Sequence, residues 1–504
     1  MIEKVLVANR GEIALRIIRA CKELGIRSVA VYSDADVNSL HVRYADESYR
    51  IGPPDPSESY LNVDRIVEVA LKCGADAIHP GYGFLSENPE FARRCEEEGI
   101  IFVGPSSRTL ELSGDKLACK KEMERHGIPT IPGSEVGGEE DAMRVAKELG
   151  YPILLKSVYG GGGRGIRLVR DEEELRKALK VAMMEAKAAF GREELYIEKY
   201  IEGARHIEFQ ILRDAYGHAV HLGERESSIQ RRYQKLIELS PSPMLDEGMR
   251  EEMGRMAVKA AEAIEYTNAG TIEFLVDRDR NPYFMEVNAR LQVEHPVTEM
   301  VTGVDIVKEQ LRLASGERLD LRQEQLALNG AAIECRINAE DPSKGFLPSV
   351  GEIVTYIPPT GPGIRVDSSI YPGYRVDRNY DPLLAKVIAH GRSYEEARLR
   401  MLAALEGMVI GGVETVIPFH LVVLKDEAFI KGDLSTDFIE RRGILDKVRR
   451  EMERGRRTTE LKAAGIAAYL IAKNKLVPKV EAKREGRRWK QAYRYGVMGL
   501  AEGF

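Results

Sequence analysis

Residues 283–294 read Y-F-M-E-V-N-A-R-L-Q-V-E, and from Glu286 onward every second residue is polar. A period of two predicts an extended strand with one buried face. Residues 271–276, T-I-E-F-L-V, precede a D-R-D-R-N-P turn, so we expect the two runs to form a hairpin. Glu273 can then face Glu286. With the amide oxygen of Asn288 nearby, this carboxylate pair suits Mg2+, which prefers hard oxygen ligands.

The length of this polar stretch adds a geometric condition. On a straight strand, Glu286 and Glu294 would lie about 26 Å apart, at about 3.3 Å per residue. One compact site cannot use both ends unless the chain bends. We therefore predict a bend after about Arg290, with a metal end and an anion end on one elongated cleft. A merely solvated polar face is the alternative interpretation.

The bulk properties exclude several classes of protein. A chain of 504 residues is long enough for about two to four domains. It has no apolar run near the length of a membrane span, and its N-terminus enters an expected strand at once, which leaves no room for a signal peptide. The five cysteines are scattered without a C-x-x-C pair, as is typical of reduced thiols. We expect a cytoplasmic protein that does not span a membrane.

Strands and helices alternate at the start of the chain, where expected strands at 4–8 and 28–32 flank a helix at 12–24. This alternation predicts a parallel, doubly wound sheet. Later segments mix hairpins with helices, which predicts α+β units. The expected fold class is therefore α/β and α+β in several domains. We place them at 1–114, 115–315 with a flap subdomain at about 131–203, 329–440, and a basic helical tail at 445–504.

A glycine run at 160–165 reads G-G-G-G-R-G and formally satisfies the dinucleotide-binding pattern G-x-G-x-x-G. That pattern needs a helix directly after the loop, but the strand-like sequence I-R-L-V-R follows here. We interpret the run as a hairpin tip whose backbone N–H groups lie over phosphates. Lys156, on the strand that enters the loop, and Lys116 are natural partners of those phosphates. A flexible turn without a ligand is the alternative.

Six longer motifs resemble one family: N-R-G-E-I-A, H-P-G-Y-G-F-L-S-E-N, R-H-I-E-F-Q, S-I-Q-R-R-Y-Q-K, E-V-N-A-R-L-Q-V-E-H-P-V-T-E and E-C-R-I-N-A-E-D. They look like biotin carboxylase, within the ATP-grasp superfamily, and the match runs in order from residue 1 to about 440. The resemblance implies an N-terminal doubly wound domain, a central ATP-grasp domain with a mobile glycine-rich flap, and a C-terminal mixed α+β domain. It also implies ATP-dependent carboxylation of biotin by bicarbonate through carboxyphosphate.

The resemblance also implies roles for individual residues. ATP would contact Lys116, Lys156, Gly161, Gly162, Gly163, Glu198, Lys199, Ile201, His206 and Tyr233. Two Mg2+ ions, or Mn2+ in their place, would be held by Glu273, Glu286 and Asn288. Bicarbonate would contact Lys235, Arg290, Gln292, Val293 and Glu294, and biotin would contact Arg336 and Tyr82. The catalytic residues would be Glu294, Arg290, Arg336 and Lys235.

These residue types suit the implied chemistry. Glu294 would remove the proton of bicarbonate, and the dianion would attack the γ-phosphate of ATP. Lysines and metal ions would neutralise charge on the transferred phosphoryl group. Arg336 would stabilise the enolate-like ureido oxygen of biotin, because a fixed guanidinium does so better than a flexible ammonium. Tyr233 stands where the family usually has His, and Tyr159 where it often has Gly, so a nucleotide contact and the stiffness of the flap are left open.

Biotin is expected on another polypeptide, because no A-M-K-M-like attachment turn occurs in the sequence. The expected partners are a biotin carrier protein, a carboxyltransferase and, by analogy with relatives, a second copy of the chain. Residues 447–494 carry sixteen Lys and Arg against five Glu. No recognised nucleic-acid motif accompanies them, so we expect no nucleic acid. A docking surface for an acidic partner and a solvated helical tail are equally compatible with this charge.

The tail favours one carboxylase over others. It resembles that of the stand-alone biotin carboxylase subunit of archaeal-type pyruvate carboxylases, with acetyl-CoA and propionyl-CoA carboxylase as alternatives. Another ATP-grasp ligase, joining an acyl phosphate to an amine, would share Glu273 and Glu286 but would not need Arg336. A non-catalytic scaffold would not need Lys116 or Glu294, so their presence disfavours it.

Overall fold

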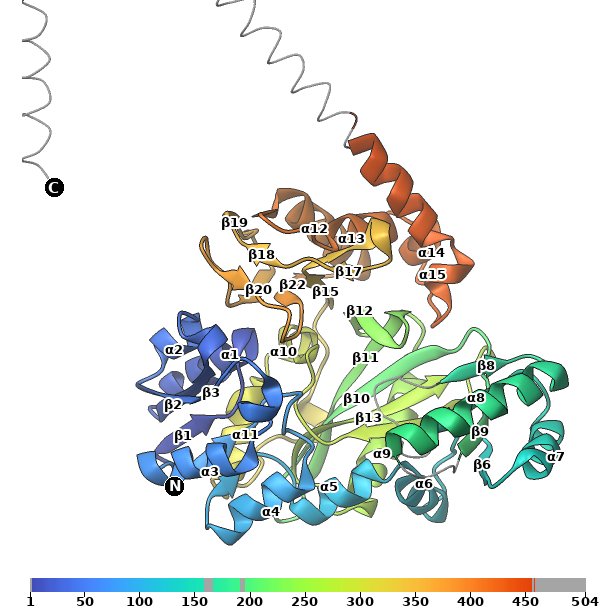
Figure 1. The fold of residues 1–504 in the computed structure, drawn as a ribbon, viewed down its shortest axis with the longest axis horizontal. Coiled ribbons are helices and arrows are strands. Elements are labelled where there is room, and N and C mark those ends of the chain that lie inside the picture. The colour runs from blue at the N-terminus through green and yellow to red at the C-terminus, as the bar shows by residue number, and fades with distance from the viewer. Residues whose placement is uncertain (1, 158–165, 191–194, 456, 458–504) are drawn as a thin grey trace, which may run out of the picture. The chain divides into compact units, whose positions relative to one another are not determined.

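The computed structural model describes residues 2–157, 166–190, 195–455 and 457 (Figure 1). The chain divides into two units, 1–449 and 450–504, and only the first is described over most of its length. The predicted phosphate loop with Tyr159 and Gly161–Gly163, and most of the predicted basic tail, lie outside the described residues. In the described part, no helix is both long and apolar enough to cross a membrane.

The first sheet is parallel with strand order β3-β2-β1-β4-β5, which confirms the doubly wound sheet predicted for the N-terminal region. Leu6 of β1 packs in one core with residues of α3 and α4, and Val5 packs in another with residues of α1. Helices therefore cover both faces, as a parallel sheet requires. The elements are β1 (Lys4–Val7), α1 (Gly11–Glu23), β2 (Arg27–Ser33), α2 (Leu40–Tyr44), β3 (Glu47–Gly52), α3 (Val63–Cys73), β4 (Ala77–His79), α4 (Pro89–Glu97) and β5 (Ile101–Phe102).

Two helices, α5 (Ser107–Gly114) and α6 (Lys116–Arg125), connect this sheet to the next part of the chain. Asp115 caps α6 and accepts the backbone N–H groups of Leu117 and Ala118 at 3.1 and 3.0 Å. Such a cap satisfies N–H groups that have no partner within the helix and typically contributes about 1 kcal/mol. The cap fixes the first residue of α6, which is Lys116, beside the site described below.

A four-stranded antiparallel sheet of order β6-β9-β7-β8 follows, with α7 and α8 sharing its core. Its elements are β6 (Gly133–Val136), α7 (Glu139–Leu149), β7 (Ile153–Ser157), β8 (Arg167–Val169), α8 (Glu172–Phe190) and β9 (Leu195–Lys199). β7 and β8 are the two strands predicted to flank the glycine run, and they pair with each other. This bears out the prediction that a strand, not a helix, follows the run.

The largest sheet has eight strands in the order β14-β13-β10-β11-β12-β15-β22-β20. β12 pairs with β15, so one sheet joins the segments predicted as the second and third domains, whose boundaries stay predictions. The strands are β10 (Arg205–Arg213), β11 (Ala219–Arg231), β12 (Gln234–Ser240), β13 (Asn268–Val276), β14 (Pro282–Asn288), β15 (Ala331–Asn338), β20 (Ile364–Ser368) and β22 (Leu383–Gly391).

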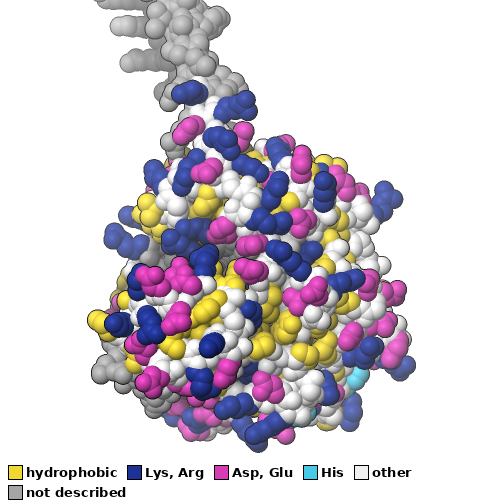
Figure 2. Space-filling model, turned by 90° about the vertical axis from the view of Figure 1, so that its right-hand side faces the viewer, with side chains coloured by type: hydrophobic (Ala, Val, Ile, Leu, Met, Phe, Trp, Pro, Cys, Tyr) yellow, Lys and Arg dark blue, Asp and Glu magenta, His cyan; other side chains and the backbone are white. Residues whose placement is uncertain are grey.

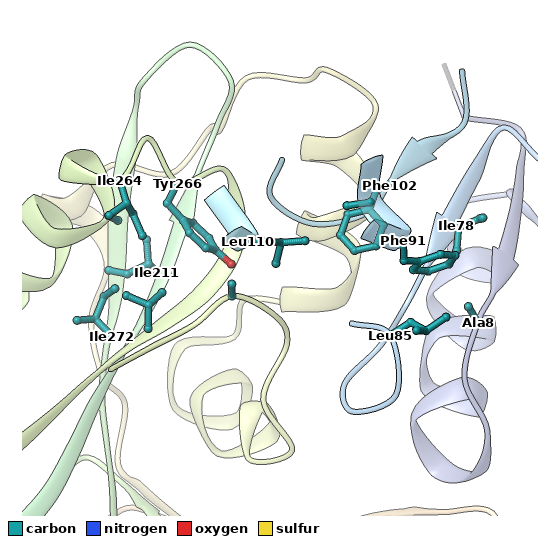
Figure 3. Close-up of a cluster of buried hydrophobic side chains, with 14 of the residues drawn as sticks. Ala8, Ile78, Leu85, Phe91, Phe102, Leu110, Ile211, Ile264, Tyr266 and Ile272 are labelled. Atoms are coloured by element: carbon teal, nitrogen blue, oxygen red, sulfur yellow. The ribbon is translucent and has the colours of Figure 1, made fainter. Parts of the chain in front are cut away.

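The two faces of this sheet differ because apolar and polar residues alternate along β10 and β13. Ile207, Phe209 and Ile272 face α9 (Glu247–Ala263) in a core that continues through Leu110 of α5 to the first sheet (Figure 3). The intervening residues, including Glu208 and Glu273, lie on the opposite face. The same kind of alternation that predicted a strand at 283–294 therefore places apolar side chains on the face that packs against α9 and charged side chains on the opposite face.

The β11–β12 hairpin was not predicted. β11 continues to Arg231, and β12 follows after a two-residue turn at Arg232 and Tyr233. Both turn residues have positive φ, +48° and +63°, a conformation for which Asn-Gly is the usual sequence. Because the turn contains no glycine, the sequence carries no signal for it. The hairpin nevertheless brings Lys235 into the sheet.

Further elements of the first unit are helices and short strands: α10 (His295–Thr302), α11 (Ile306–Ala314), β16 (Glu340–Asp341), β17 (Leu347–Pro348), β18 (Gly351–Glu352), β19 (Thr355–Ile357), β21 (Arg375–Val376), α12 (Tyr394–Gly407), β23 (Val409–Gly411), α13 (Ile417–Leu424), α14 (Glu427–Ile430) and α15 (Phe438–Arg441). On the face seen in Figure 2, acidic and basic side chains are interspersed. That face therefore lacks the single-sign patch typical of nucleic-acid binding.

Candidate active site

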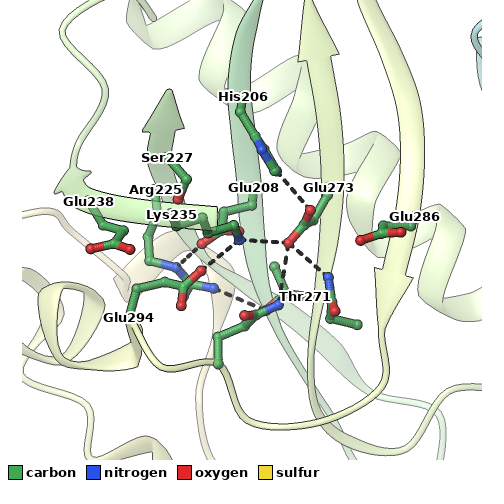
Figure 4. A network of polar contacts seen from close by, with 12 residues as sticks. His206, Glu208, Arg225, Ser227, Lys235, Glu238, Thr271, Glu273, Glu286 and Glu294 are labelled. Atoms are coloured by element: carbon green, nitrogen blue, oxygen red, sulfur yellow. Dashed lines mark hydrogen bonds and ion pairs between the residues drawn. The ribbon is translucent and has the colours of Figure 1, made fainter. Parts of the chain in front are cut away.

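A row of charged side chains crosses the polar face of the eight-stranded sheet (Figure 4). Glu286, Glu273 and Glu208 are direct cross-strand partners on β14, β13 and β10, and Arg225 on β11 pairs with Glu208. Arg336 and Lys386 are cross-strand partners on β15 and β22. We call this row the polar belt; in strand order it comprises Glu286, Glu273, Glu208, Arg225, Lys235, Arg336 and Lys386.

The predicted hairpin and bend are both present. Glu273 pairs with Glu286 between β13 and β14, and β14 ends at Asn288, two residues before the predicted position, with a bend at Arg290. The chain then turns into α10, whose N-cap is Glu294. The bend returns Glu294 to the sheet, so the site runs across the strands rather than along one of them.

Lys235 is the centre of the polar belt. Its Nζ donates to Glu273 Oε1 at 2.8 Å, to Glu294 Oε1 at 2.6 Å, and to Glu208 Oε2. Burial alone would lower the pKa of Lys235, but the three carboxylates raise it above its ordinary value. A single ammonium therefore joins the predicted metal ligand Glu273 to the predicted base Glu294.

The predicted metal ligands form an ionised group. Burial favours protonation of Glu273, yet Lys235 and His206 outweigh it and lower its pKa to about 2. Burial likewise raises the pKa of Glu286, and Lys116, which donates to Glu286 Oε2 at 2.8 Å, brings it below its usual range. Asn288 Nδ2 donates to Glu273 Oε1 at 2.8 Å. Two ionised carboxylates and an amide on adjacent strands fit a hard divalent cation such as Mg2+.

His206 lies among these carboxylates. Gln230 Nε2 donates to His206 Nδ1 at 2.6 Å, so His206 Nε2–H donates to Glu273 Oε2 at 2.7 Å. The ligating atoms of His206, Glu208 and Glu273 lie within 4.8 Å of one another. A second candidate metal group, distinct from the predicted one, therefore exists among the described residues, although Lys235 already binds both of its carboxylates.

The predicted anion-binding residues gather at the bend. Arg290 donates through Nε to Glu87 Oε2 at 2.9 Å and through Nη2 to Asn288 Oδ1 at 3.0 Å. Gln292 Nε2 donates to Glu273 Oε1 at 3.3 Å. Glu87, which the sequence analysis did not single out, also accepts the backbone N–H of Ala289 at 3.1 Å. It therefore holds both the chain at the bend and the guanidinium of Arg290.

Glu294 is fully buried between two cations. Besides Lys235, it accepts a hydrogen bond from Arg336 Nη2 at 2.9 Å through Oε2. Burial would raise the pKa of Glu294, but these cations keep it below its usual range. The carboxylate is therefore ionised, as a general base must be before it can accept a proton.

Lys386 supports the bend through the backbone. This fully buried lysine donates from Nζ to the Val293 carbonyl at 3.1 Å and lies 3.1 Å from Glu12 Oε2. Glu12 accepts the hydroxyl hydrogen of Tyr82. The two predicted substrate contacts Val293 and Tyr82 are thus linked by one buried ion pair, which the sequence analysis missed.

Of the predicted ATP contacts outside the glycine run, two lysines donate to carboxylates of the site, and three other residues point away from it or are exposed. Lys156 donates to Glu198 Oε1, and Lys116 reaches Glu286, so both predicted phosphate lysines end at carboxylates. Lys199, one residue after Glu198 on β9, points to the other face, where its Nζ donates to the Gly150 carbonyl at 2.8 Å. Ile201 follows β9 and is partly exposed, and Tyr233 is 51% exposed at the β11–β12 turn.

Several residues of the site were not predicted individually: Glu12, Glu87, Glu208, Arg225, Glu238 and Lys386. The first three stand within motifs quoted from the sequence, so listing every charged residue of those motifs would have found them. A signal for Arg225 was the run of polar residues at 224–228, all of which are buried in β11. Glu238 and Lys386 follow no local pattern, because their partners lie on strands far away in the sequence.

Three family descriptions match consecutive parts of the chain that form this site. Residues 1–110 match the family described as "Biotin carboxylase, N-terminal domain", and residues 334–441 match "Biotin carboxylase C-terminal domain". Residues 115–322 match "Carbamoyl-phosphate synthase L chain, ATP binding domain". The matches follow one another along the chain in the order that the sequence motifs led us to expect.

Individual relatives are similar in sequence to this chain over nearly their whole length. Biotin carboxylase 1 of Bacillus subtilis is 56% identical over 443 residues, 87% of this chain and 98% of the relative. A pyruvate carboxylase subunit of Methanothermobacter thermautotrophicus is 52% identical over 482 residues, 94% of this chain and 98% of the relative. The crystal structure of the biotin carboxylase domain dimer of Hydrogenobacter thermophilus 2-oxoglutarate carboxylase, in complex with MgADP, ADP and bicarbonate, is 54% identical with a TM-score of 0.85 and covers 88% of this chain and 98% of that one. The chain therefore belongs to the biotin carboxylase family of ATP-grasp enzymes.

Proposed function

We propose that the chain carboxylates biotin on a separate carrier protein, using ATP and bicarbonate, as the biotin carboxylase subunit of a pyruvate carboxylase. The observation that carries this proposal is the contact of one ammonium, Lys235 Nζ, with both Glu273 and Glu294. Nucleotide phosphates at the first carboxylate and bicarbonate at the second would be neighbours. An ATP-grasp ligase for another acceptor would have no need of the second carboxylate.

The first step is activation of bicarbonate. Glu294 is ionised and held by two cations, so bicarbonate would displace Lys235 and Arg336 from it and leave the carboxylate free to accept the proton. Arg290, fixed by Glu87, and Lys235 would then carry the negative charge of the dianion. Its oxygen attacks the γ-phosphorus of ATP, the bond to the bridging oxygen of ADP breaks, and carboxyphosphate forms.

Glu273 and Glu286, with Asn288, would hold Mg2+, which when bound neutralises charge on the nucleotide phosphates. Lys116 and Lys156 would contact the phosphates; they donate to Glu286 and Glu198 respectively, and each would release its carboxylate. Ionised carboxylates at this end need no proton loss before they bind a cation. Ion pairs between side chains of the site hold it together, and the substrates would replace them.

The second step concerns biotin. Carboxyphosphate would break into CO2 and phosphate, and the phosphate would take the proton from the ureido nitrogen of biotin. That nitrogen would then attack CO2, while Arg336, released from Glu294, would stabilise the negative charge on the ureido oxygen. Tyr82, fixed by Glu12, would lie at the biotin side. The partners in this proposal are a second copy of the chain, a biotin carrier protein and a carboxyltransferase.

Pyruvate is preferred as the final acceptor because the match to the Methanothermobacter protein extends over 94% of the chain, whereas the match to the Bacillus biotin carboxylase covers 87%. A match over 94% of a chain of 504 residues has to extend into the predicted basic tail, which begins at residue 445. A 2-oxoglutarate carboxylase is the second candidate, favoured by the similar Hydrogenobacter structure. Purifying the chain from its source and identifying the biotinylated protein and the keto acid that the complex carboxylates would separate the two.

Free biotin provides the direct test of the activity. The purified chain should hydrolyse ATP in a bicarbonate-dependent manner, and biotin should stimulate this hydrolysis and become carboxylated. Hydrolysis that requires an amine instead of biotin would assign the site to another ligase. Deleting residues 458–504 should leave free-biotin carboxylation intact and abolish association with the partner proteins if the tail is a docking segment.

A further inference from the structure

Arg336 is held from two sides by carboxylates. Its Nε donates to Glu238 Oε1 at 2.7 Å, and its Nη2 donates to Glu294 Oε2 at 2.9 Å. Both carboxylates are fully buried, and only 17% of the Arg336 side chain is exposed. The two contacts are not equivalent. In the proposed reaction Glu294 has to release Arg336 and accept the proton of bicarbonate, whereas Glu238 contacts no substrate and can keep its hydrogen bond to Arg336.

The backbone around Glu238 leaves little room for movement. Glu238 lies on β12 directly opposite Glu334 of β15, and Arg336 follows two residues later on the same face of β15. The Arg336 carbonyl lies 2.7 Å from Nε2 of the buried His420. The Glu238 carboxylate and the Arg336 guanidinium therefore extend from two paired strands in the interior of the eight-stranded sheet. Rigid elements of this kind hold a functional group precisely in position.

We propose that Glu238 is the positioning residue for Arg336, which it retains through Nε after Glu294 has released the guanidinium to receive bicarbonate. With Nε held, the two terminal nitrogens stay free to donate to the ureido oxygen of biotin, because a guanidinium presents its donors in a fixed planar fork. Without this anchor the side chain would be free to follow Glu294 or to swing away. This inference rests on the proposed function and extends it to a residue beyond the substrate contacts.

The electrostatic surroundings make the anchor sensitive to pH. Six charged or titratable groups interact electrostatically with Glu238: Arg336, Glu294, Lys235, Glu208, Glu334 and Cys335. Burial raises the pKa of Glu238 to about 7, although Arg336 opposes the shift. Its Oε2 has no hydrogen-bond partner among the described residues. Protonation of Glu238 below neutral pH would remove the ion pair with Arg336, so the biotin step should lose rate on the acidic side.

Glu334 provides a matched control. It is as fully buried as Glu238, lies opposite it on the neighbouring strand, and neither of its carboxylate oxygens has a hydrogen-bond partner among the described residues. Burial raises its pKa well above the ordinary value, which favours the neutral form. Glu334→Gln therefore keeps the size of the side chain and breaks no hydrogen bond among the described residues, whereas Glu238→Gln removes the carboxylate that accepts from Arg336 Nε.

The experiment compares two rates in the full-length chain: carboxylation of free biotin, and bicarbonate-dependent ATP hydrolysis without biotin. Glu238→Gln should lower kcat/KM for biotin about 100-fold, the order expected when a reacting group is misplaced by about 1 Å, with a much smaller loss of ATP hydrolysis. It should also abolish the acidic limb of the biotin rate. Glu334→Gln should match the unmodified enzyme in both rates, and Glu238→Asp should recover part of the loss.

The outcomes separate this inference from the proposed function. Equal losses of both rates in Glu238→Gln, or no loss of either, would overturn the positioning role while the unmodified enzyme still carboxylates biotin. If Glu238→Gln does not fold, the same comparison is made with Glu238→Asp, whose shorter side chain withdraws the anchor but keeps its charge. An unmodified enzyme without biotin-stimulated turnover would overturn the proposed function and this inference together.

Discussion

The polar face of the eight-stranded sheet holds two cross-strand carboxylate pairs with opposite behaviour. Glu273 and Glu286, on β13 and β14, have pKa values below the ordinary range. Glu238 and Glu334, on β12 and β15, have pKa values above it. Glu273 is 2% exposed, nearly as buried as the second pair, so the difference does not come from burial alone.

The number of cations and donors that touch each carboxylate accounts for the difference. Glu273 accepts hydrogen bonds from Lys235, His206, Asn288 and Gln292. Glu334 has no hydrogen-bond partner among the described residues. Hydrogen bonds and positive charges favour the ionised form, and desolvation without them favours the neutral form. One sheet face thus carries carboxylates with lowered pKa values at the proposed metal end and carboxylates with raised pKa values at the proposed biotin end.

The largest predicted effect concerns Glu294, between the two pairs. Glu294→Gln should lower bicarbonate-dependent ATP cleavage by about 1,000-fold, because the amide cannot accept the bicarbonate proton. Affinity for ADP, measured by calorimetry, should change little, since Glu294 does not contact the predicted nucleotide residues Lys116 and Lys156. A large loss of ADP affinity would show that Glu294 maintains the metal end, and would contradict its assignment as the base.

Arg336→Ala should act at the biotin end only. Carboxylation of free biotin should fall about 100-fold, while bicarbonate-dependent ATP hydrolysis without biotin should fall far less. Arg336→Lys keeps the charge but loses the planar fork, so it should recover little of the biotin rate. If both rates fall equally in Arg336→Ala, the guanidinium acts before biotin enters, and the two ends of the polar belt are not functionally separate.

At the metal end, Glu273→Gln should raise the Mg2+ concentration required for half-maximal ATP hydrolysis about tenfold, the order seen when groups around a metal are altered. Glu208→Gln is the matched control. Glu208 also binds Lys235, but it is not one of the Mg2+ ligands of the proposed function, so its replacement should leave this concentration unchanged. Equal shifts in both variants would instead favour the group formed by His206, Glu208 and Glu273.

The backbone geometry at the proposed metal end was predictable from the sequence because its signals are local. The hairpin, the Glu273–Glu286 register and the bend followed from a period of two and a strand's rise per residue. Glu238 could not be found in this way, since its partners Glu334 and Arg336 lie on a strand far away in the sequence. Lys386 and Val293 are separated by 93 residues. Such contacts arise from the pairing of β12 with β15 and of β15 with β22, which no local pattern encodes.

The smallest predicted effect tests the neutral state of Glu334 by stability. A glutamate whose pKa is raised on folding stabilises the native state fully below the unfolded pKa of about 4.3, and this contribution is lost as pH rises toward the folded pKa, by about 1.4 kcal/mol per pH unit. Glu334→Gln has no such loss, so its free energy of unfolding should improve relative to the unmodified chain between pH 5 and pH 8.

Chemical unfolding of the full chain at several pH values would measure this difference, and Glu352→Gln, at an exposed position of β18, controls for the removal of a carboxylate as such. Parallel pH profiles for the unmodified chain and Glu334→Gln would mean that Glu334 is ionised in the folded protein. Arg336 would then face two anions, on β12 and β15, and the contrast between the two carboxylate pairs would reduce to a difference in their hydrogen bonds.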